Sequence, residues 1–235
     1  MIDRLVYRDC RPFDLLPQVR HAGLVSEPTP QGPRERLLEA AERVTYREGA
    51  SVGVATLLKE ANVARRSLYE HFGGKDELLA EVLRGAAVKD LDAYRAAMSD
   101  AGQDPAGRIL AIFDHLEAAA TTEGFRGCRY LGAELALQDP EHPVHAVARA
   151  YRAELHQLIQ DELVRLGHAE AAYDAERIMF LIEGTLASAT TRPEARPARI
   201  AADLAAQILR LDPPDAPKRD RVRTDGRART MTDGL

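Results

Sequence analysis

The sequence contains few of the residues on which several classes of fold and site depend. Among 235 residues, aromatic side chains make up 5%, and there are two cysteines, Cys10 and Cys128. Two cysteines are too few for a disulfide framework, and their spacing fits no zinc site. β-Branched residues never gather into the alternating runs that indicate strands. These absences argue against a disulfide-stapled protein, a zinc protein and a β-sheet protein.

Long hydrophobic runs are also missing. The first residues, MIDRLVYRDCRPFD, contain no apolar stretch long enough for a signal peptide. No run approaches the ~20 apolar residues of a membrane span. We therefore expect a soluble, cytoplasmic protein with reduced thiols and no membrane partner.

The motifs of common enzymes are absent as well. There is no G-x-S-x-G, no paired set of carboxylates and no phosphate-cradling glycine loop. We therefore predict no enzyme, no catalytic residue and no cofactor. A small-molecule-handling enzyme centred on Cys128 or on the pair His142 and His145 is one alternative. Cys128 as a redox sensor is another, since Arg126 and Arg129 would lower its thiol pKa. A buried structural cysteine and capping or surface histidines are the simpler interpretation, and we predict no metal site.

Strong helix formers dominate what the sequence does contain. Arg, Ala, Leu and Glu are abundant, and apolar residues recur at helical spacing from Pro33 onward. We predict an all-α protein of about nine helices. Their expected ranges are 33–49, 54–61, 64–72, 75–98, 106–122, 128–138, 144–167, 174–191 and 197–211.

Composition and charge divide the chain into four segments. We expect a flexible arm over residues 1–32, a first helical domain over 33–84, a second over 85–211 and a disordered, Pro- and Arg-rich tail over 212–235.

The net charge of −5 is distributed unevenly along the chain. Residues 33–84 carry 9 Lys and Arg against 9 Asp and Glu, whereas residues 85–211 carry 13 against 19. Because the acidity lies in the second domain, it does not exclude a nucleic-acid partner for the first.

The stretch ANVARRSLYEHFGGKDELL, residues 61–79, predicts a helix-turn-helix. Asn62 tolerates the left-handed backbone that the turn needs. Leu68 and Phe72 lie four residues apart and are expected to face the core. The outward face of the second short helix would then carry Arg65, Arg66, Ser67, Tyr69 and Glu70.

Those outward residues suit a DNA major groove. Arginine reads guanine through two hydrogen bonds, whereas hydroxyl groups and lysine bind phosphate oxygens. Lys75 opens the following helix, where backbone N–H groups also favour a phosphate. A solvated charged face, or a helical protein-binding or adaptor module that uses the same surface, is the alternative interpretation.

From about Arg34 to Leu83 the sequence resembles the DNA-binding domain of TetR/AcrR-type transcriptional regulators. The most specific part is Val63 to Leu79, VARRSLYEHFGGKDELL. The resemblance implies that Ser67, Tyr69, His71 and Lys75 touch the DNA backbone or support the helix, and that Arg65 and Arg66 read bases. The chain departs from the family pattern at Gly53, Ala55 and Asn62, so we expect fewer DNA contacts from the preceding helix.

The resemblance also implies a ligand-responsive regulator, most often a repressor, that binds a pseudo-palindromic double-stranded operator as a homodimer. The last two helices of such proteins pair between subunits. Here they carry more apolar residues than one core face needs: Ile178, Phe180, Leu181, Leu186, Ile200, Leu204 and Ile208. Gly184, Ala187 and Ser188 would allow close helix approach.

Aromatic and polar residues of the second domain are candidates for the pocket of an unknown small-molecule effector. Helical spacing does not separate pocket lining from core packing, so each is also compatible with a core position. The candidates are Tyr94, Phe113, His115, Cys128, Tyr130, Tyr151, His156 and Phe180.

Overall fold

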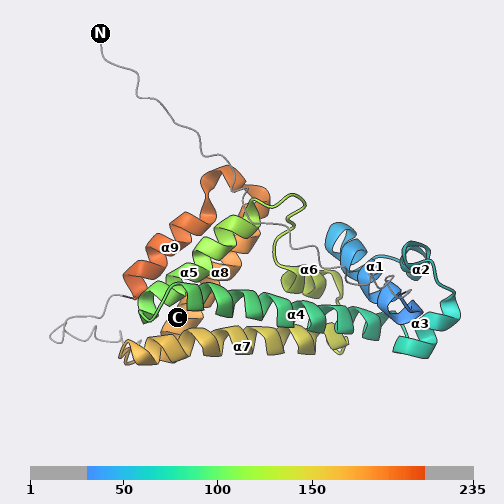
Figure 1. The fold of residues 1–235 in the computed structure, drawn as a ribbon, viewed down its shortest axis with the longest axis horizontal. Coiled ribbons are helices and arrows are strands. Elements are labelled where there is room, and N and C mark those ends of the chain that lie inside the picture. The colour runs from blue at the N-terminus through green and yellow to red at the C-terminus, as the bar shows by residue number, and fades with distance from the viewer. Residues whose placement is uncertain (1–30, 210–235) are drawn as a thin grey trace, which may run out of the picture. The chain divides into compact units, whose positions relative to one another are not determined.

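The computed structural model of the protein describes residues 31–209, and these form nine α-helices and one short 3-10 helix without any strand (Figure 1). The prediction of an all-α protein is thereby confirmed. The arm up to residue 30 and the tail over 212–235 lie outside the described residues. The helices are α1 (Pro33–Glu48), α2 (Val54–Ala61), α3 (Arg65–Phe72), α4 (Lys75–Asp100), α5 (Pro105–Ala120), α6 (Arg129–Ala136), α7 (Pro143–Arg165), α8 (Ala171–Thr191), η1 (Pro193–Ala195) and α9 (Pro197–Ile208).

Local sequence signals place most helix ends close to their predicted positions. Pro33 occupies the first turn of α1, and Gly49 ends that helix with a φ of 94°. The predicted and observed bounds of α2 coincide. None of the helices within residues 31–209 is long and apolar enough to cross a membrane.

The first of two clusters of buried residues joins α1, α2, α3 and the first turns of α4; we call this part the head. Helix α1 packs against the other three helices. Apolar residues at helical spacing supply the inner faces, which explains why four short amphipathic segments bury a common core. The buried residues are Leu37, Ala40, Ala41, Val44, Leu57, Ala61, Leu68, Phe72, Leu78 and Val82.

The second cluster joins α4 to α9, which we call the body. Helices α4 and α7 run side by side, and α5, α8 and α9 pack against one another toward the end of α4 that is remote from the head (Figure 1). Helix α4 belongs to both parts, because Leu78 and Val82 are buried in the head cluster while Leu79 and Leu83 are buried in the body cluster. The predicted domain boundary after residue 84 therefore falls inside one continuous helix.

A capped turn connects α4 to α5. The Asp104 carboxylate accepts a hydrogen bond from the Gly107 backbone N–H at 2.9 Å, and Pro105 occupies the first helical position. A carboxylate at this place satisfies backbone donors that the helix leaves unpaired. The sequence Asp-Pro thus fixes where α5 begins.

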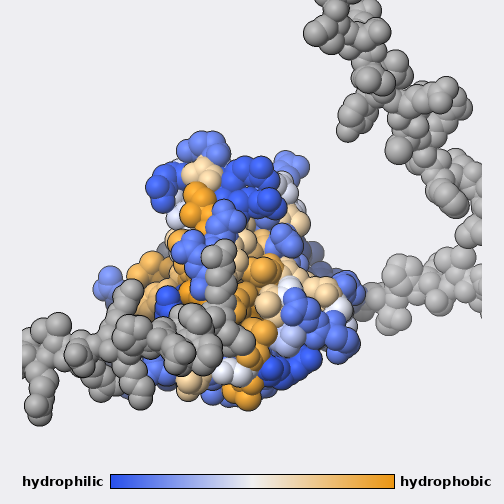
Figure 2. Space-filling model, turned by 90° about the vertical axis from the view of Figure 1, so that its left-hand side faces the viewer, coloured by the Kyte–Doolittle hydropathy of each residue, from blue (hydrophilic) through white to orange (hydrophobic). Residues whose placement is uncertain are grey.

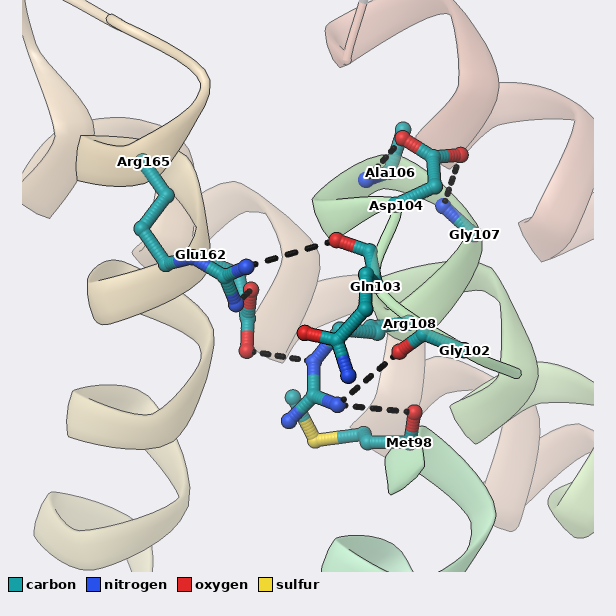
Figure 3. Close-up of polar contacts among 9 residues, drawn as sticks. All are labelled: Met98, Gly102, Gln103, Asp104, Ala106, Gly107, Arg108, Glu162 and Arg165. Atoms are coloured by element: carbon teal, nitrogen blue, oxygen red, sulfur yellow. Dashed lines mark hydrogen bonds and ion pairs between the residues drawn. The ribbon is translucent and has the colours of Figure 1, made fainter. Parts of the chain in front are cut away.

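A network of ion pairs and hydrogen bonds connects the α4–α5 turn to α7 (Figure 3). Arg108 of α5 donates to the Glu162 carboxylate at 2.7 Å and to the carbonyl oxygens of Met98 and Gly102, each at 3.2 Å. Arg165 donates to the other oxygen of Glu162 at 2.6 Å. Glu162 is buried, and a buried carboxylate is destabilising unless it is paired, so these two guanidinium groups compensate its negative charge.

Candidate functional site

The turn between α2 and α3 has the backbone that the sequence predicts. Asn62 adopts the left-handed conformation, with φ 50° and ψ 54°, and its N–H bonds to the end of α2. Val63 packs against the head cluster. Leu68 and Phe72 are buried at 0% and 7% exposure, so α3 turns its opposite face outward.

The outward face of α3 is cationic at its first turn. Arg65 and Arg66 are exposed, and no acidic residue lies in that turn. Arg65 forms no ion pair within residues 31–209, whereas Arg66 pairs with Glu70 one turn later. Both side chains of this pair are half or more exposed, and a pair of this kind contributes roughly 0.3–0.5 kcal/mol. Arg66 can therefore leave Glu70 for another partner at little cost.

The remaining predicted residues of α3 lie on or beside the same face. Tyr69 is 53% exposed although its ring is apolar. His71 is exposed and its ring packs edge-on against Phe72. Ser67 is half-buried. The structure thus brings the hydroxyl, imidazole and guanidinium groups to one short helix.

Lys75 is the first residue of α4, immediately after the Gly73-Gly74 break. Gly73 has a φ of 74°, which lets the chain reverse direction between the two helices. Lys75 is half-buried, and burial lowers the pKa of its ammonium group while the Asp76 charge opposes that shift. Lys75 therefore lies at a helix start, directly after the end of α3.

A cavity of about 310 Å³ is lined mainly by residues of the body. Its volume falls at the lower end of the range typical of small-molecule sites. Five of the eight predicted effector residues line it: Tyr94, His115, Cys128, Tyr130 and Tyr151.

Aromatic contacts order the wall of this first cavity. The rings of Tyr130 and Tyr151 stack with centroids 3.8 Å apart, and Tyr94 meets His115 edge-on at 5.4 Å. The Tyr130 hydroxyl donates to the Asp90 carboxylate at 2.8 Å. Burial raises the pKa of Tyr94, Tyr130 and Tyr151 above the ordinary tyrosine value. The wall therefore presents neutral phenols beside the charged side chains of Asp90 and Arg129.

Three of the predicted effector residues do not line this cavity. Phe113 is 1% exposed and belongs to the inner core face of α5. His156 lies on α7, where its ring nitrogen bonds to the Ala172 carbonyl of α8. Phe180 is 67% exposed on α8. Phe113 lies three positions before the lining residue Leu116 and so shares its side of α5, but its ring packs into the core. His156 and Phe180 lie five and six positions from Tyr151 and Leu186, the lining residues of their helices, and so point away from the cavity.

The cavity wall also includes residues that the sequence analysis missed. Tyr46 of α1 lines it, so the head contributes to the wall. The Tyr46 hydroxyl accepts a hydrogen bond from the Arg126 backbone N–H at 2.9 Å, and the Arg129 guanidinium lies over the Tyr46 ring at 4.9 Å. Asp90 and Phe125 also line the cavity and were not predicted. No local pattern marks them, because their contacts join segments far apart in the sequence.

Cys128 caps the start of α6. Its sulfur accepts from the Leu131 backbone N–H at 3.4 Å. Burial raises the pKa of the Cys128 thiol, and the Arg152 charge opposes this only in part. The idea that Arg126 and Arg129 lower this pKa is therefore wrong, because desolvation of the thiolate outweighs the positive charges nearby.

The two histidines of the EHPVH segment have structural partners. His142 is the N-cap of α7, where its Nδ1 accepts from the Val144 N–H at 3.2 Å. His145 bonds through Nε2 to the Leu137 carbonyl at 3.0 Å. The capping interpretation is confirmed for His142, although its side chain is buried and not on the surface. Within residues 31–209 no group of three His, Cys, Asp or Glu side chains could hold a metal ion.

Helices α8 and α9 expose apolar side chains on their outer faces. Of the seven apolar residues predicted to exceed the core, Phe180, Ile200 and Leu204 are 67%, 54% and 44% exposed. Figure 2, which views the side of the body on which α9 lies, shows apolar patches between hydrophilic ones. The other four residues pack into or against the body core: Ile178, Leu181, Leu186 and Ile208.

Comparison with known proteins identifies related sequences and folds. The family model described as bacterial regulatory proteins, tetR family, matches residues 37–82. A solved structure of a candidate TetR transcriptional regulator from Streptomyces avermitilis is 35% identical, with a TM-score of 0.62, and the match covers 74% of this chain and 98% of that chain. The structure of SCO4454, a TetR-family transcriptional regulator from Streptomyces coelicolor, is 29% identical with a TM-score of 0.71, covering 77% of this chain and 90% of that one.

A curated relative matches over a shorter range. The HTH-type transcriptional regulator TtgR from Pseudomonas putida is 33% identical over 97 residues, which cover 39% of this chain. The match spans 46% of the length of TtgR, or less than half of that protein.

Proposed function

The chain belongs to the TetR family of bacterial regulatory proteins, and from that premise we propose that it is a ligand-responsive transcriptional repressor that binds DNA as a homodimer. The observation that carries this proposal is the exposed cationic first turn of α3, presented by a left-handed turn at Asn62 and a buried inner face. In a helix-turn-helix the N-terminal residues of the second helix contact base edges.

The chemistry of each side chain indicates which part of the DNA it would contact. Arg65 and Arg66 would contact base edges. A bidentate contact from arginine to guanine favours the correct base over another by about 1–3 kcal/mol. This exceeds the roughly 0.3–0.5 kcal/mol that the exposed pair between Arg66 and Glu70 contributes. Arg66 would therefore exchange Glu70 for a base. Ser67, Tyr69, His71 and Lys75 would hold the phosphate backbone or support α3.

The outer faces of α8 and α9 are the proposed dimer interface. Phe180, Ile200 and Leu204 expose apolar surface that a second copy would bury. A Cβ added at Gly184 meets no heavy atom within 4 Å, so a helix of the partner has room to approach there. Two heads related by a twofold axis would bind two half-sites of a pseudo-palindromic operator.

The first cavity is the proposed effector site. Its wall includes Tyr46 of the head as well as residues of the body, so an occupant that shifts this wall can move the head relative to the body. We propose that the effector binds more tightly to a conformation in which the spacing of the two α3 helices no longer fits the operator. Because a ligand shifts an equilibrium toward the state that it binds more tightly, effector binding would weaken DNA binding.

Selection of bound sequences from random duplex DNA tests the function directly. We expect the full chain to enrich a pseudo-palindrome and to bind it with an affinity that falls steeply as salt rises. Sedimentation at micromolar concentration should show a dimer. Absence of any enriched sequence, together with salt-independent or undetectable DNA binding, would refute the proposal.

A further inference from the structure

A second cavity of about 250 Å³ lies where the head meets the body, and the proposed function does not use it. The end of α1 and the first turns of α4 form one side of it. Helix α6, the residues before it and the start of α7 form the other side. Tyr46, Cys128 and Arg129 line both cavities, so they form the partition between the two.

The inner lining of the second cavity is apolar and buried. Leu79, Leu83, Ala133 and Val144 are all less than a tenth exposed, yet all four border the cavity. Apolar surface of this kind favours an apolar occupant, because each methylene that moves from water onto it gains free energy. The body of the ligand should therefore be hydrocarbon.

The charged lining of the same cavity is mainly positive. Arg47, Arg126 and Arg129 border it, against a single acidic residue, Glu42. Arg129 is balanced by ion pairs to Glu42 and to Asp90, each at 3.6 Å. The excess positive charge is therefore carried by the other two arginines.

Arg126 is the lining guanidinium that can bind a ligand without giving up an ion pair. Arg47 pairs with the neighbouring Glu48 at 2.6 Å, although both side chains are exposed and this pair is weak. The side chain of Arg126 makes no ion pair or hydrogen bond in the part of the chain that the structure describes, although its backbone N–H bonds to Tyr46. A guanidinium binds a carboxylate through two parallel hydrogen bonds.

We propose that the second cavity binds a small carboxylate with an apolar body, and that the carboxylate pairs with Arg126 while the hydrocarbon lies against Leu79, Leu83, Ala133 and Val144. This site lies beyond the proposed effector site, because Arg126 and the four apolar residues do not line the first cavity. Its ligand contacts the head and the body at once, and it touches the partition that the two cavities share. Occupancy of one cavity should therefore change affinity at the other.

Octanoate serves as the probe, with octylammonium and octanol as matched compounds that differ only in the polar end. Binding to the full chain is measured by calorimetry at fixed salt and at concentrations where the probes are monomeric. We expect octanoate to bind at least tenfold more tightly than octylammonium and roughly tenfold more tightly than hexanoate, which lacks two methylenes. Equal binding of octanoate and octylammonium, or no binding of octanoate at millimolar concentration, would overturn the proposal.

Two variants locate the site. Arg126→Gln should weaken octanoate binding about tenfold and leave octanol binding unchanged, because only the charged end loses its partner. Gly132→Leu should abolish binding of both. Gly132 borders only the second cavity, and a Cβ there meets no heavy atom within 4 Å, so the leucine fills the cavity without a clash at its first carbon.

Matched controls separate these effects from general ones. Arg149→Gln removes an exposed arginine of α7 that borders neither cavity, and Ala150→Leu places the same side chain at an exposed position of that helix, which also borders neither cavity. Both controls should bind octanoate like the unsubstituted chain. Unchanged octanoate binding in Arg126→Gln and Gly132→Leu would place the probe elsewhere and refute the inference. These measurements use no DNA, so a failure of the proposed regulatory function is detected separately, by the selection experiment.

Discussion

Removing Arg108 should destabilise the body more than removing any exposed arginine, because Arg108 compensates a buried charge. Replacement by methionine keeps most of the apolar stem and removes the guanidinium. The variant loses a charge-assisted hydrogen bond to Glu162 and two bonds to carbonyl groups at the end of α4. A bond to a charged group contributes about 1.5–3 kcal/mol, and a buried carboxylate with fewer partners adds a penalty.

The expected loss is about 3 kcal/mol in the free energy of unfolding, moderated because Arg165 still bonds to Glu162. For a protein of this size, such a loss lowers Tm by about 6–12 °C. The double variant Arg108→Met with Glu162→Met should recover part of this loss, since no uncompensated carboxylate then stays buried. A positive coupling of roughly 2 kcal/mol is expected from the double-mutant cycle.

Urea unfolding followed by circular dichroism, at one protein concentration for all variants, measures these differences. A fixed concentration is needed because the proposed dimerisation would make apparent stability depend on it. Arg149→Met on the exposed face of α7 is the control and should change stability by less than about 0.5 kcal/mol. Two results would show that the ion-pair network does not hold the α4–α5 turn as described. One is a stability loss in Arg108→Met as small as that of the control. The other is a loss in the double variant that exceeds the sum of the losses in the two single variants.

Three further predictions concern the dimer, the thiol and acid stability. Gly184→Arg should split the dimer, so sedimentation at micromolar concentration should give a monomer with unchanged helix content; an unaltered dimer would place the interface elsewhere. In a Cys10→Ser background, the thiol of Cys128 should react with iodoacetamide at pH 8 more slowly in the folded than in the urea-unfolded chain, because burial raises its pKa; equal rates would contradict this. Burial would raise the pKa of Glu134, but hydrogen bonding to Arg152 outweighs it and the pKa lies below its ordinary value. The stabilisation is then complete above the unfolded pKa of about 4.3 and is lost as pH falls toward the lower folded pKa, so Glu134→Gln should flatten the acid limb of a stability profile measured by urea unfolding; an unchanged acid limb would contradict it.

The helices and the turn were predictable from the sequence because their determinants are local. Pro33 and Gly49 mark the ends of α1, and Asn62 takes the left-handed conformation at the turn. Leu68 and Phe72 are buried as their four-residue spacing predicts. The outward face of α3 follows from these few residues.

The cavities were less predictable because their determinants are tertiary. Tyr46 lies beside the inner stripe of α1, and its hydrogen bond is to a residue 80 positions away. Phe113 has the same helical spacing as lining residues but points into the core. Periodicity tells which face of a helix is buried, but it does not tell whether that face meets another helix or an empty space.

The most direct test of the central claim is the DNA affinity of three variants on a panel of site sequences at several salt concentrations. Arg65→Ala or Arg66→Ala should cost about 1–3 kcal/mol on the preferred site and relax sequence preference at one position of each half-site. Lys75→Ala should weaken binding to all sequences alike and reduce the salt slope by about one for each head. Arg149→Ala on the body is the control and should change neither quantity. If both arginine variants retain full affinity and sequence preference, α3 is not a recognition helix and its two arginines are a solvated face.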